Sequence, residues 1–406
     1  MSKKNILLIS SLVLGLIFVG LVVYLLSINS KATSTGGISV FRKFFPFGGD
    51  TVIVDDENNT ATSTPKEEAP VNSENFKQSL RKISSEPVAG AGTLDIKSGT
   101  IVRYVEKATG HIYEVELFSP KHERISNTTI PLTYDALWGN KNNSLVARYL
   151  NSDDAQVESY YLTLNNSSST ENTLKSIALP KNIEDVSSFG ANFFYLVQNT
   201  NSSTGYVSDF NGKNKMIWSS DIKELTTQFV NSKIVALNTK PAQKISGYLY
   251  FVDTATGQNR RILGDISGLT TLSDPLGEKI ALLSQDDSVR FMFYTVKTKA
   301  YVDINPITFP EKCVWSKKDT NVLYCAVPKD YISGNSLISW YKGLISYSDD
   351  IWKYDLKNNV STIVGELSKA SLVDIDVIKP VLSENEQYLV FINKKDNSLW
   401  SLDLLQ

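Results

Sequence analysis

The sequence predicts an all-β fold, a seven-bladed β-propeller, preceded by one N-terminal transmembrane helix and a flexible linker. Seven hairpins rich in Val, Ile, Tyr and Phe recur at intervals of about 40 to 47 residues, the period of a four-stranded blade. A long apolar run follows two lysines at the N-terminus, and a polar stretch separates that run from the first hairpin. The same hairpins are also compatible with six or eight blades.

The apolar run lies between Ile6 and Leu26 and reads ILLISSLVLGLIFVGLVVYLL. At about 1.5 Å per residue it is long enough for the roughly 30 Å core of a bilayer. We therefore expect a cytoplasmic stub at 1–4 and a transmembrane helix at 5–27. Lys3 and Lys4 favour a cytoplasmic N-terminus, with the rest of the chain outside the membrane. The alternative is a signal peptide cleaved after the small-x-small sequence at 30–32.

Residues 28–86 are rich in Ser, Thr, Asn, Glu and Pro, which is typical of a flexible linker. Two segments inside it are exceptions. The aromatic and basic sequence FRKFFPF (41–47) suits a membrane interface or a patch that packs on the folded domain. The sequence TVIVDD (51–56) is predicted to form a single strand.

Residues 87–406 are assigned to the propeller. The first and last hairpins, VRYVEKATGHIYEVEL (102–117) and LVFINKKDNSLWSLDL (389–404), align without a gap. Each has an apolar strand, a four-residue polar turn and a second strand. The final repeat ends after three strands, so its blade requires one more. We expect the strand at 51–56 to complete that blade and close the ring.

A recurring turn precedes several hairpins, as in ALWGNKNNSLVA, LSDPLGEKIALL, VWSKKDTNVLYC and VLSENEQYLVFI. These degenerate segments resemble the repeats of TolB-type and WD-like β-propellers, which implies the propeller fold. The whole chain also resembles uncharacterised membrane-anchored envelope proteins of candidate-phylum bacteria, a resemblance that implies no activity.

The charge balance excludes a nucleic-acid footprint, because 41 basic and 43 acidic residues give a net charge of −2. The two histidines, His111 and His122, are expected at opposite ends of the third strand of the first blade. They cannot share a metal ion there, so we predict neither a metal site nor a cofactor.

The two cysteines lie six residues to either side of Asp319. On two antiparallel strands joined by a turn at that residue, Cys313 and Cys325 would face each other closely enough to form a disulfide. A disulfide suits an extracytoplasmic domain. Two buried free thiols are the alternative.

No nucleophile motif and no phosphate-binding glycine loop is present, so a non-catalytic function is favoured. A catalytic pair of carboxylates remains an alternative, since glycoside hydrolysis requires only two acidic residues.

Two features suggest a binding surface. The second-to-third turn of the sixth blade contains about 20 extra residues, 328–349, and long loops of this kind are often functional. Its aromatic residues are of the types enriched in binding sites, namely Tyr331, Trp340, Tyr341 and Tyr347. The alternative is a loop folded down on its own blade.

The second feature is a set of acids in equivalent turns, which would form a broken acidic rim on the same face: Asp153, Asp154, Asp286, Asp287, Asp349, Asp350 and Asp396. Aspartate is also an ordinary turn residue. Together these features predict a platform for a protein or cell-wall partner. The alternatives are a glycan-active enzyme with carboxylates at the central channel, and a structural subunit of an envelope complex.

Overall fold

The computed structural model describes residues 79–151, 156–164, 174–286, 288–330, 332–333 and 336–405. The predicted stub, transmembrane helix and strand at 51–56 lie outside these ranges. Within the described ranges, no helix has the length and apolar character that crossing a bilayer requires.

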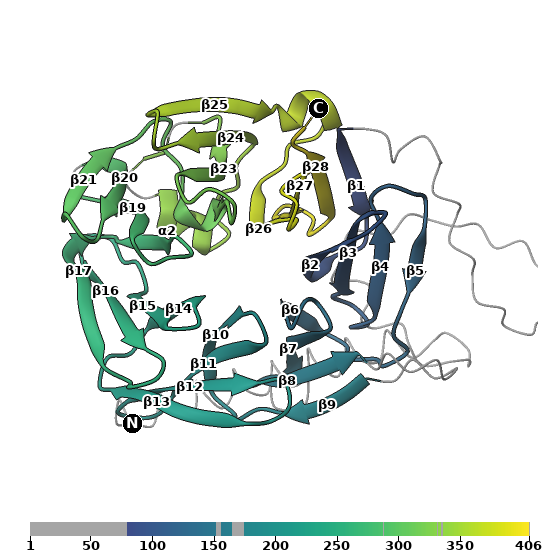
Figure 1. Cartoon of the computed structure of the whole chain (residues 1–406), viewed down its shortest axis with the longest axis horizontal. Helices are drawn as coiled ribbons and strands as arrows, with labels where there is room; N and C mark the ends of the chain where they lie inside the picture. Colours follow the sequence, from purple (N-terminus) through teal and green to yellow (C-terminus); the bar gives the residue numbers. More distant parts are fainter. Residues whose placement is uncertain are drawn as a thin grey trace, which may run out of the picture. The chain divides into compact units, whose positions relative to one another are not determined.

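Seven four-stranded antiparallel sheets stand around a central axis, which confirms the seven-bladed propeller (Figure 1). Blades 1 to 6 each use four consecutive strands. Listed from the innermost strand outward, they are β2 (Val88–Ile96), β3 (Gly99–Glu106), β4 (Ile112–Glu116) and β5 (His122–Arg124); β6 (Thr133–Gly139), β7 (Ser144–Asn151), β8 (Gln156–Leu164) and β9 (Leu174–Ala178); β10 (Ile183–Phe189), β11 (Asn192–Gln198), β12 (Ser203–Asp209) and β13 (Asn214–Ser220); β14 (Leu225–Asn231), β15 (Ile234–Thr239), β16 (Ser246–Asp253) and β17 (Asn259–Ser267); β18 (Thr270–Ser273), β19 (Lys279–Gln285), β20 (Val289–Thr295) and β21 (Ala300–Asp303); and β22 (Cys313–Trp315), β23 (Val322–Pro328), β24 (Asp349–Asp355) and β25 (Val360–Gly365).

Blade 7 combines the two ends of the propeller. It contains β26 (Val377–Leu382), β27 (Tyr388–Asn393), β28 (Leu399–Asp403) and, outermost, the N-terminal strand β1 (Leu80–Ser84). A strand from the N-terminal side therefore closes the ring, but it is 80–84 and not the expected 51–56. Only three residues separate Ser84 from the start of β2, so β1 leads directly into blade 1. Leu80 and Ile83 are buried and anchor it.

Consecutive apolar residues fit because each blade is covered on both sides by its neighbours. In β11, Phe193 and Tyr195 pack in a cluster shared with blade 2, whereas Phe194 and Leu196 pack in one shared with blade 4. All four are at most 1% exposed. Burial of each such side chain contributes roughly 1.5–3 kcal/mol of transfer free energy.

Side chains connect neighbouring innermost strands with hydrogen bonds. The Trp138 indole N–H donates to the Gly90 carbonyl, and the Ser188 hydroxyl donates to the Trp138 carbonyl. Gly90 is required where β2 approaches β6, because a Cβ there would lie 1.8 Å from the Ala136 carbonyl oxygen. The innermost strands are thereby held at fixed positions around the channel.

Antiparallel order places alternate turns on opposite faces of the ring. The second-to-third turns and the connections between blades lie on one face, which we call the insertion face because residues 329–348 lie there, between β23 and β24. This segment contains α2 (Ser336–Tyr341). The 3-10 turn η3 (Pro310–Lys312) precedes blade 6 and α3 (Leu367–Ser371) follows it. The first-to-second and third-to-fourth turns form the opposite face.

Candidate functional site

The insertion 329–348 packs largely on its own propeller. Trp340 and Tyr347 are 4% and 5% exposed, and their rings lie 5.4 Å and 5.7 Å from the ring of Phe309. These two predicted binding residues are therefore core residues, as in the alternative of a loop folded down on its blade. Tyr331 lies outside the described residues.

A buried ion cluster lies beneath the insertion. The Lys312 ammonium is 2.5 Å from a carboxylate oxygen of Asp349 and 2.5 Å from one of Asp376, and all three side chains are fully buried. The Trp340 indole N–H donates to Asp376, and the Val377 amide donates to Asp349 over 2.7 Å. Burial raises the pKa of Asp349 to about 6, although Lys312 opposes the shift. Asp349 therefore belongs to the interior and not to an acidic rim.

Part of the insertion remains at the surface. Tyr341 is 45% exposed, with its hydroxyl hydrogen-bonded to the Glu311 carboxylate, and Leu344 is 72% exposed. Tyr341 is therefore the one predicted aromatic residue that the structure describes and leaves on the insertion face.

Of the other predicted acids that the structure describes, Asp350 and Asp396 have local partners, and Asp286 is exposed. Asp350 accepts a hydrogen bond from the Leu367 amide and pairs with Lys329, while Asp396 accepts from the amide and hydroxyl of Ser398. Asp286 lies in the turn between β19 and β20. Asp153, Asp154 and Asp287 lie outside the described residues. The described members act as turn and contact residues of their own blades.

The histidines lie near opposite ends of β4, as the repeat register predicts: His111 directly precedes it, and His122 begins β5 opposite Val115. His122 Nε2 is 2.9 Å from the Tyr104 hydroxyl, and His111 Nε2 is 3.2 Å from the Thr129 hydroxyl. Within the described ranges, no group of three or more His, Cys, Asp or Glu side chains has the arrangement of a metal site.

Cys313 and Cys325 are directly paired between β22 and β23 and are joined by a disulfide. Both are buried, in the same cluster as Trp340. The bridge thus fixes the short innermost strand of blade 6 beside the insertion.

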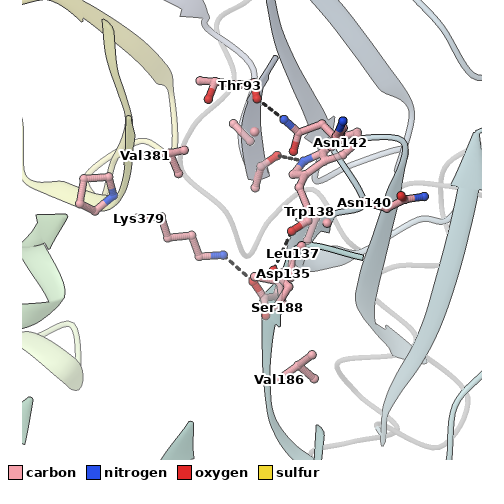
Figure 2. A pocket seen from close by; sticks show the side chains of 18 of the residues that line it. Thr93, Asp135, Leu137, Trp138, Asn140, Asn142, Val186, Ser188, Lys379 and Val381 are labelled. Carbon is pink, nitrogen blue, oxygen red and sulfur yellow. Dashed lines mark hydrogen bonds and ion pairs between the residues drawn. The ribbon is translucent and has the colours of Figure 1, made fainter. Parts of the chain in front are cut away.

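The central channel, where the sequence left a carboxylate pair as an alternative without naming its residues, holds a cavity of about 630 Å³ (Figure 2). Its walls come from β2, β6, β10 and β26, the innermost strands of blades 1, 2, 3 and 7. Its charged lining residues are Asp135, Lys141, Asp185, Lys317, Lys379 and Glu384. A charge within the first strand of a repeat, as in YDALW, IEDVS or VIKPV, is the sequence signal that marks Asp135, Asp185 and Lys379.

An ion pair crosses the cavity wall from blade 7 to blade 2. Figure 2 shows the Lys379 side chain directed at Asp135, and the two charged atoms are 2.5 Å apart. The ammonium also donates to the Ala89 carbonyl over 2.8 Å. Burial alone would raise the pKa of Asp135, but Lys379, Arg148 and Lys107 together lower it.

Asp185, on the neighbouring strand β10, has the opposite electrostatic environment. Desolvation raises its pKa to about 6. The same carboxylate accepts hydrogen bonds from the amide of Thr227, over 2.6 Å, and from its hydroxyl, over 3.2 Å. Asp185 therefore connects blade 3 to blade 4 while it lines the cavity.

Comparisons with known proteins support the fold. No protein-family model and no curated protein matches the chain. Among solved structures, an oligogalacturonate lyase in complex with manganese is 10% identical, with a TM-score of 0.50 over 79% of this chain and 98% of that one. The β-propeller domain of the Trilobed protease from Pyrococcus furiosus is 12% identical, with a TM-score of 0.51 over 77% and 95%. TolB from Acinetobacter baumannii is 13% identical, with a TM-score of 0.41 over 84% and 86%.

Sequence identities this low show that the fold is shared, and they say nothing about activity. The structure and the first two of these neighbours lead to one conclusion: residues 80–405 are a seven-bladed β-propeller with charged residues in the cavity at its channel and with an N-terminal closing strand.

Proposed function

We propose that the protein is a membrane-anchored, extracytoplasmic β-propeller that serves as a non-catalytic binding platform for a protein partner. The partner binds the insertion face. The observation that carries this proposal is the distribution of exposed apolar side chains.

Exposed large apolar residues gather on the insertion face: Leu132, Tyr134, Leu150, Val157, Ile245, Tyr341, Leu344, Leu372 and Val373. The turns and strand ends of the opposite face contribute fewer: Ile96, Phe189, Leu276, Tyr301, Val360 and Leu405. Apolar and aromatic side chains exposed together on one face are typical of a protein-binding surface.

The most exposed members lie on segments that the ion cluster holds together. Leu344 follows α2, and Leu372, 89% exposed, follows α3. The Asp349 amide donates to the Ile375 carbonyl over 2.9 Å, and the Lys394 ammonium donates to the Trp340 carbonyl over 2.8 Å. Because these hydrogen bonds fix the segments that carry Leu344 and Leu372, little conformational entropy is lost when a partner binds.

The membrane location rests on the sequence of residues 6–26 and on Lys3 and Lys4. The disulfide between Cys313 and Cys325 supports an oxidising compartment, since such bonds persist outside the cytoplasm. An N-terminal anchor followed by a linker would leave the propeller free to meet partners at the membrane surface.

The test is partner capture from envelope extracts by the propeller and by a Leu344→Glu/Leu372→Glu variant. We expect the variant to lose at least 90% of the captured protein. Leu276→Glu, at a 55% exposed leucine on the opposite face, is the matched control and should capture normally. Equal capture by all three proteins contradicts the proposal. Sedimentation with purified cell wall tests the other partner class, and wall binding that survives the double variant also contradicts it.

Deleting the whole turn 328–349 is a poorer test. It removes Asp349 and Trp340, which are partners of the buried charges of Lys312 and Asp376. Loss of binding would then be indistinguishable from loss of folding.

A glycan-active enzyme is the second candidate. Asp135 and Asp185 line one cavity with opposite pKa shifts, which is the pattern of an acid and its ionised partner. Binding is favoured over catalysis because both carboxylates already have partners in the fold, Lys379 and Thr227 respectively. Hydrolysis of a glycoside panel that Asp185→Asn abolishes would reverse this preference.

A further inference from the structure

We infer that the channel cavity is a binding site for a small polar molecule carrying an anionic group, a carboxylate or a phosphate, with Lys379 as the group that contacts the anion. This site is separate from the insertion-face surface, and its failure would leave the proposed partner binding untouched.

The cavity has the size and the walls of a small-molecule site. Its volume of about 630 Å³ lies within the usual range of about 300–1,000 Å³ for ligand pockets. Gly90 and Gly92 of β2 line it, so the backbone itself forms part of the wall. The remaining wall mixes apolar side chains, such as Leu137 and Trp138, with amides, hydroxyls and charged groups, such as Asn140, Asn142 and Ser188. Such a lining suits a polar ligand.

The charge near Asp135 favours an anion. Three cations, Lys379, Arg148 and Lys107, act on this one carboxylate. Lys379 approaches to 2.5 Å and Arg148 to 3.9 Å. Burial lowers the pKa of Lys107, and the charge of Lys379 adds to this shift while Asp135 opposes it. The cavity lining as a whole is balanced, with Lys141, Lys317 and Lys379 against Asp135, Asp185 and Glu384. The preference for an anion therefore rests on the local excess of three cations over the one carboxylate beside Lys379.

Lys379 has the exposure and the donor capacity for this role. Its side chain is 43% exposed, against 27% for Asp135. An ammonium has three donors, and the contacts to Asp135 and the Ala89 carbonyl use two of them. The third donor can bind a ligand oxygen while both protein contacts remain.

Direct binding to the full chain tests the inference, with titration calorimetry as the measurement. The probes are D-glucuronate, D-glucose 6-phosphate and neutral D-glucose, which share one ring and differ in charge. We expect either or both anions to bind at least tenfold more tightly than glucose. A preference for glucuronate identifies a carboxylate ligand, and a preference for the phosphate identifies a phosphorylated one. Equal binding of all three, or binding of none, overturns the inference.

Two variants give results of opposite sign. Lys379→Gln should weaken anion binding at least tenfold, while Asp135→Asn should strengthen it several-fold because it removes the carboxylate that competes for the ammonium. If the ion pair served only to maintain the structure, both Lys379→Gln and Asp135→Asn would weaken binding. Lys379→Arg, which keeps the charge, should retain binding and provides a folded comparison if Lys379→Gln unfolds.

The outer surface offers a matched control. Arg290 and Asp303 form a 2.7 Å ion pair in blade 5, with both side chains more than half exposed. Arg290→Gln and Asp303→Asn should leave anion affinity unchanged. An effect equal to that of the channel variants would mean that the probes respond only to the overall charge, and would overturn the inference.

Discussion

Lys312 and Asp376 form a fully buried ion pair that joins the turn before blade 6 to the residue preceding the first strand of blade 7. Asp349 completes the cluster from β24. Buried charges are tolerated only when each one has a partner and hydrogen bonds, as these have. The Lys312 ammonium therefore helps to hold the insertion in place, together with the packing of Trp340 and Tyr347 on Phe309.

Lys312→Met should destabilise the propeller by about 3–5 kcal/mol, because two carboxylates lose their shared cation without returning to water. Chemical denaturation at pH 7.5 measures this loss. Lys369→Met, at an exposed lysine paired only with Glu366, should change stability little. Since burial raises the pKa of Asp349 to about 6, protonation at pH 5 should reduce the Lys312→Met loss. A loss of equal size at both pH values would contradict this account.

Removal of the Cys313–Cys325 bridge should cost about 2–3 kcal/mol, the loop-closure contribution expected for cysteines 12 residues apart. A Cys313→Ala/Cys325→Ala variant, compared by denaturation with the oxidised parent, measures it. The reduced parent should unfold close to the variant. If reduction leaves the parent unchanged, the bridge contributes nothing to stability.

Leu80→Ala in β1 should destabilise the ring by about 2–5 kcal/mol, because Leu80 is 5% exposed in the core of blade 7. Lys82→Ala, on the same strand with a side chain 40% exposed, is the control and should cost well under 1 kcal/mol. Hydrogen exchange of β28 amides should accelerate in Leu80→Ala. Unchanged protection of β28 would mean that β1 does not close the ring.

Asp185→Asn should remove a pH dependence of stability. The pKa of Asp185 is about 6 in the folded protein, against about 3.9 when unfolded, so the folded state binds more protons between these values. Stability contributed by this group therefore falls as pH rises from about 4 to about 6. The variant should lack this fall and gain on the order of 1 kcal/mol at pH 7, discounted for partial solvent exposure. Thermal unfolding across this pH range checks it. A less stable variant at pH 7 would show that the hydrogen bonds from Thr227 outweigh desolvation.

Much of the propeller could be predicted from local sequence. The repeat spacing, the polar turns and the missing last strand are all local patterns, and they led to seven blades and a closing strand from the N-terminal side. The prediction that 51–56 is the closing strand was wrong. It rested on the stronger β propensity of TVIVDD. LRKIS (80–84) is one residue shorter and carries its two charges in the middle of the segment, but it lies next to β2 in the chain and pairs with β28.

The sites were harder to predict because they join distant residues. Lys312 and Asp376 are separated by 64 positions, and no local pattern marks either as buried. The sequence therefore predicted that Trp340 belongs to a binding surface, although its buried indole N–H donates a hydrogen bond to Asp376. The channel cavity brings together four strands from four repeats, and only their arrangement in the ring places Lys379 beside Asp135.

The closing strand has a mechanical consequence. β1 is the first described strand of the chain, and its pairing with β28, from Leu80 opposite Leu402 to Ser84 opposite Leu399, is what joins blade 7 to the N-terminal side. A tensile load applied through the preceding chain reaches this ladder before any other. Ring opening would then be the first step of forced unfolding. In a single-molecule experiment, pulling from the N-terminus should release β1 as the first unfolding event. The force of that event should be lower than the force of the first unfolding event when the protein is pulled from a residue within blade 4.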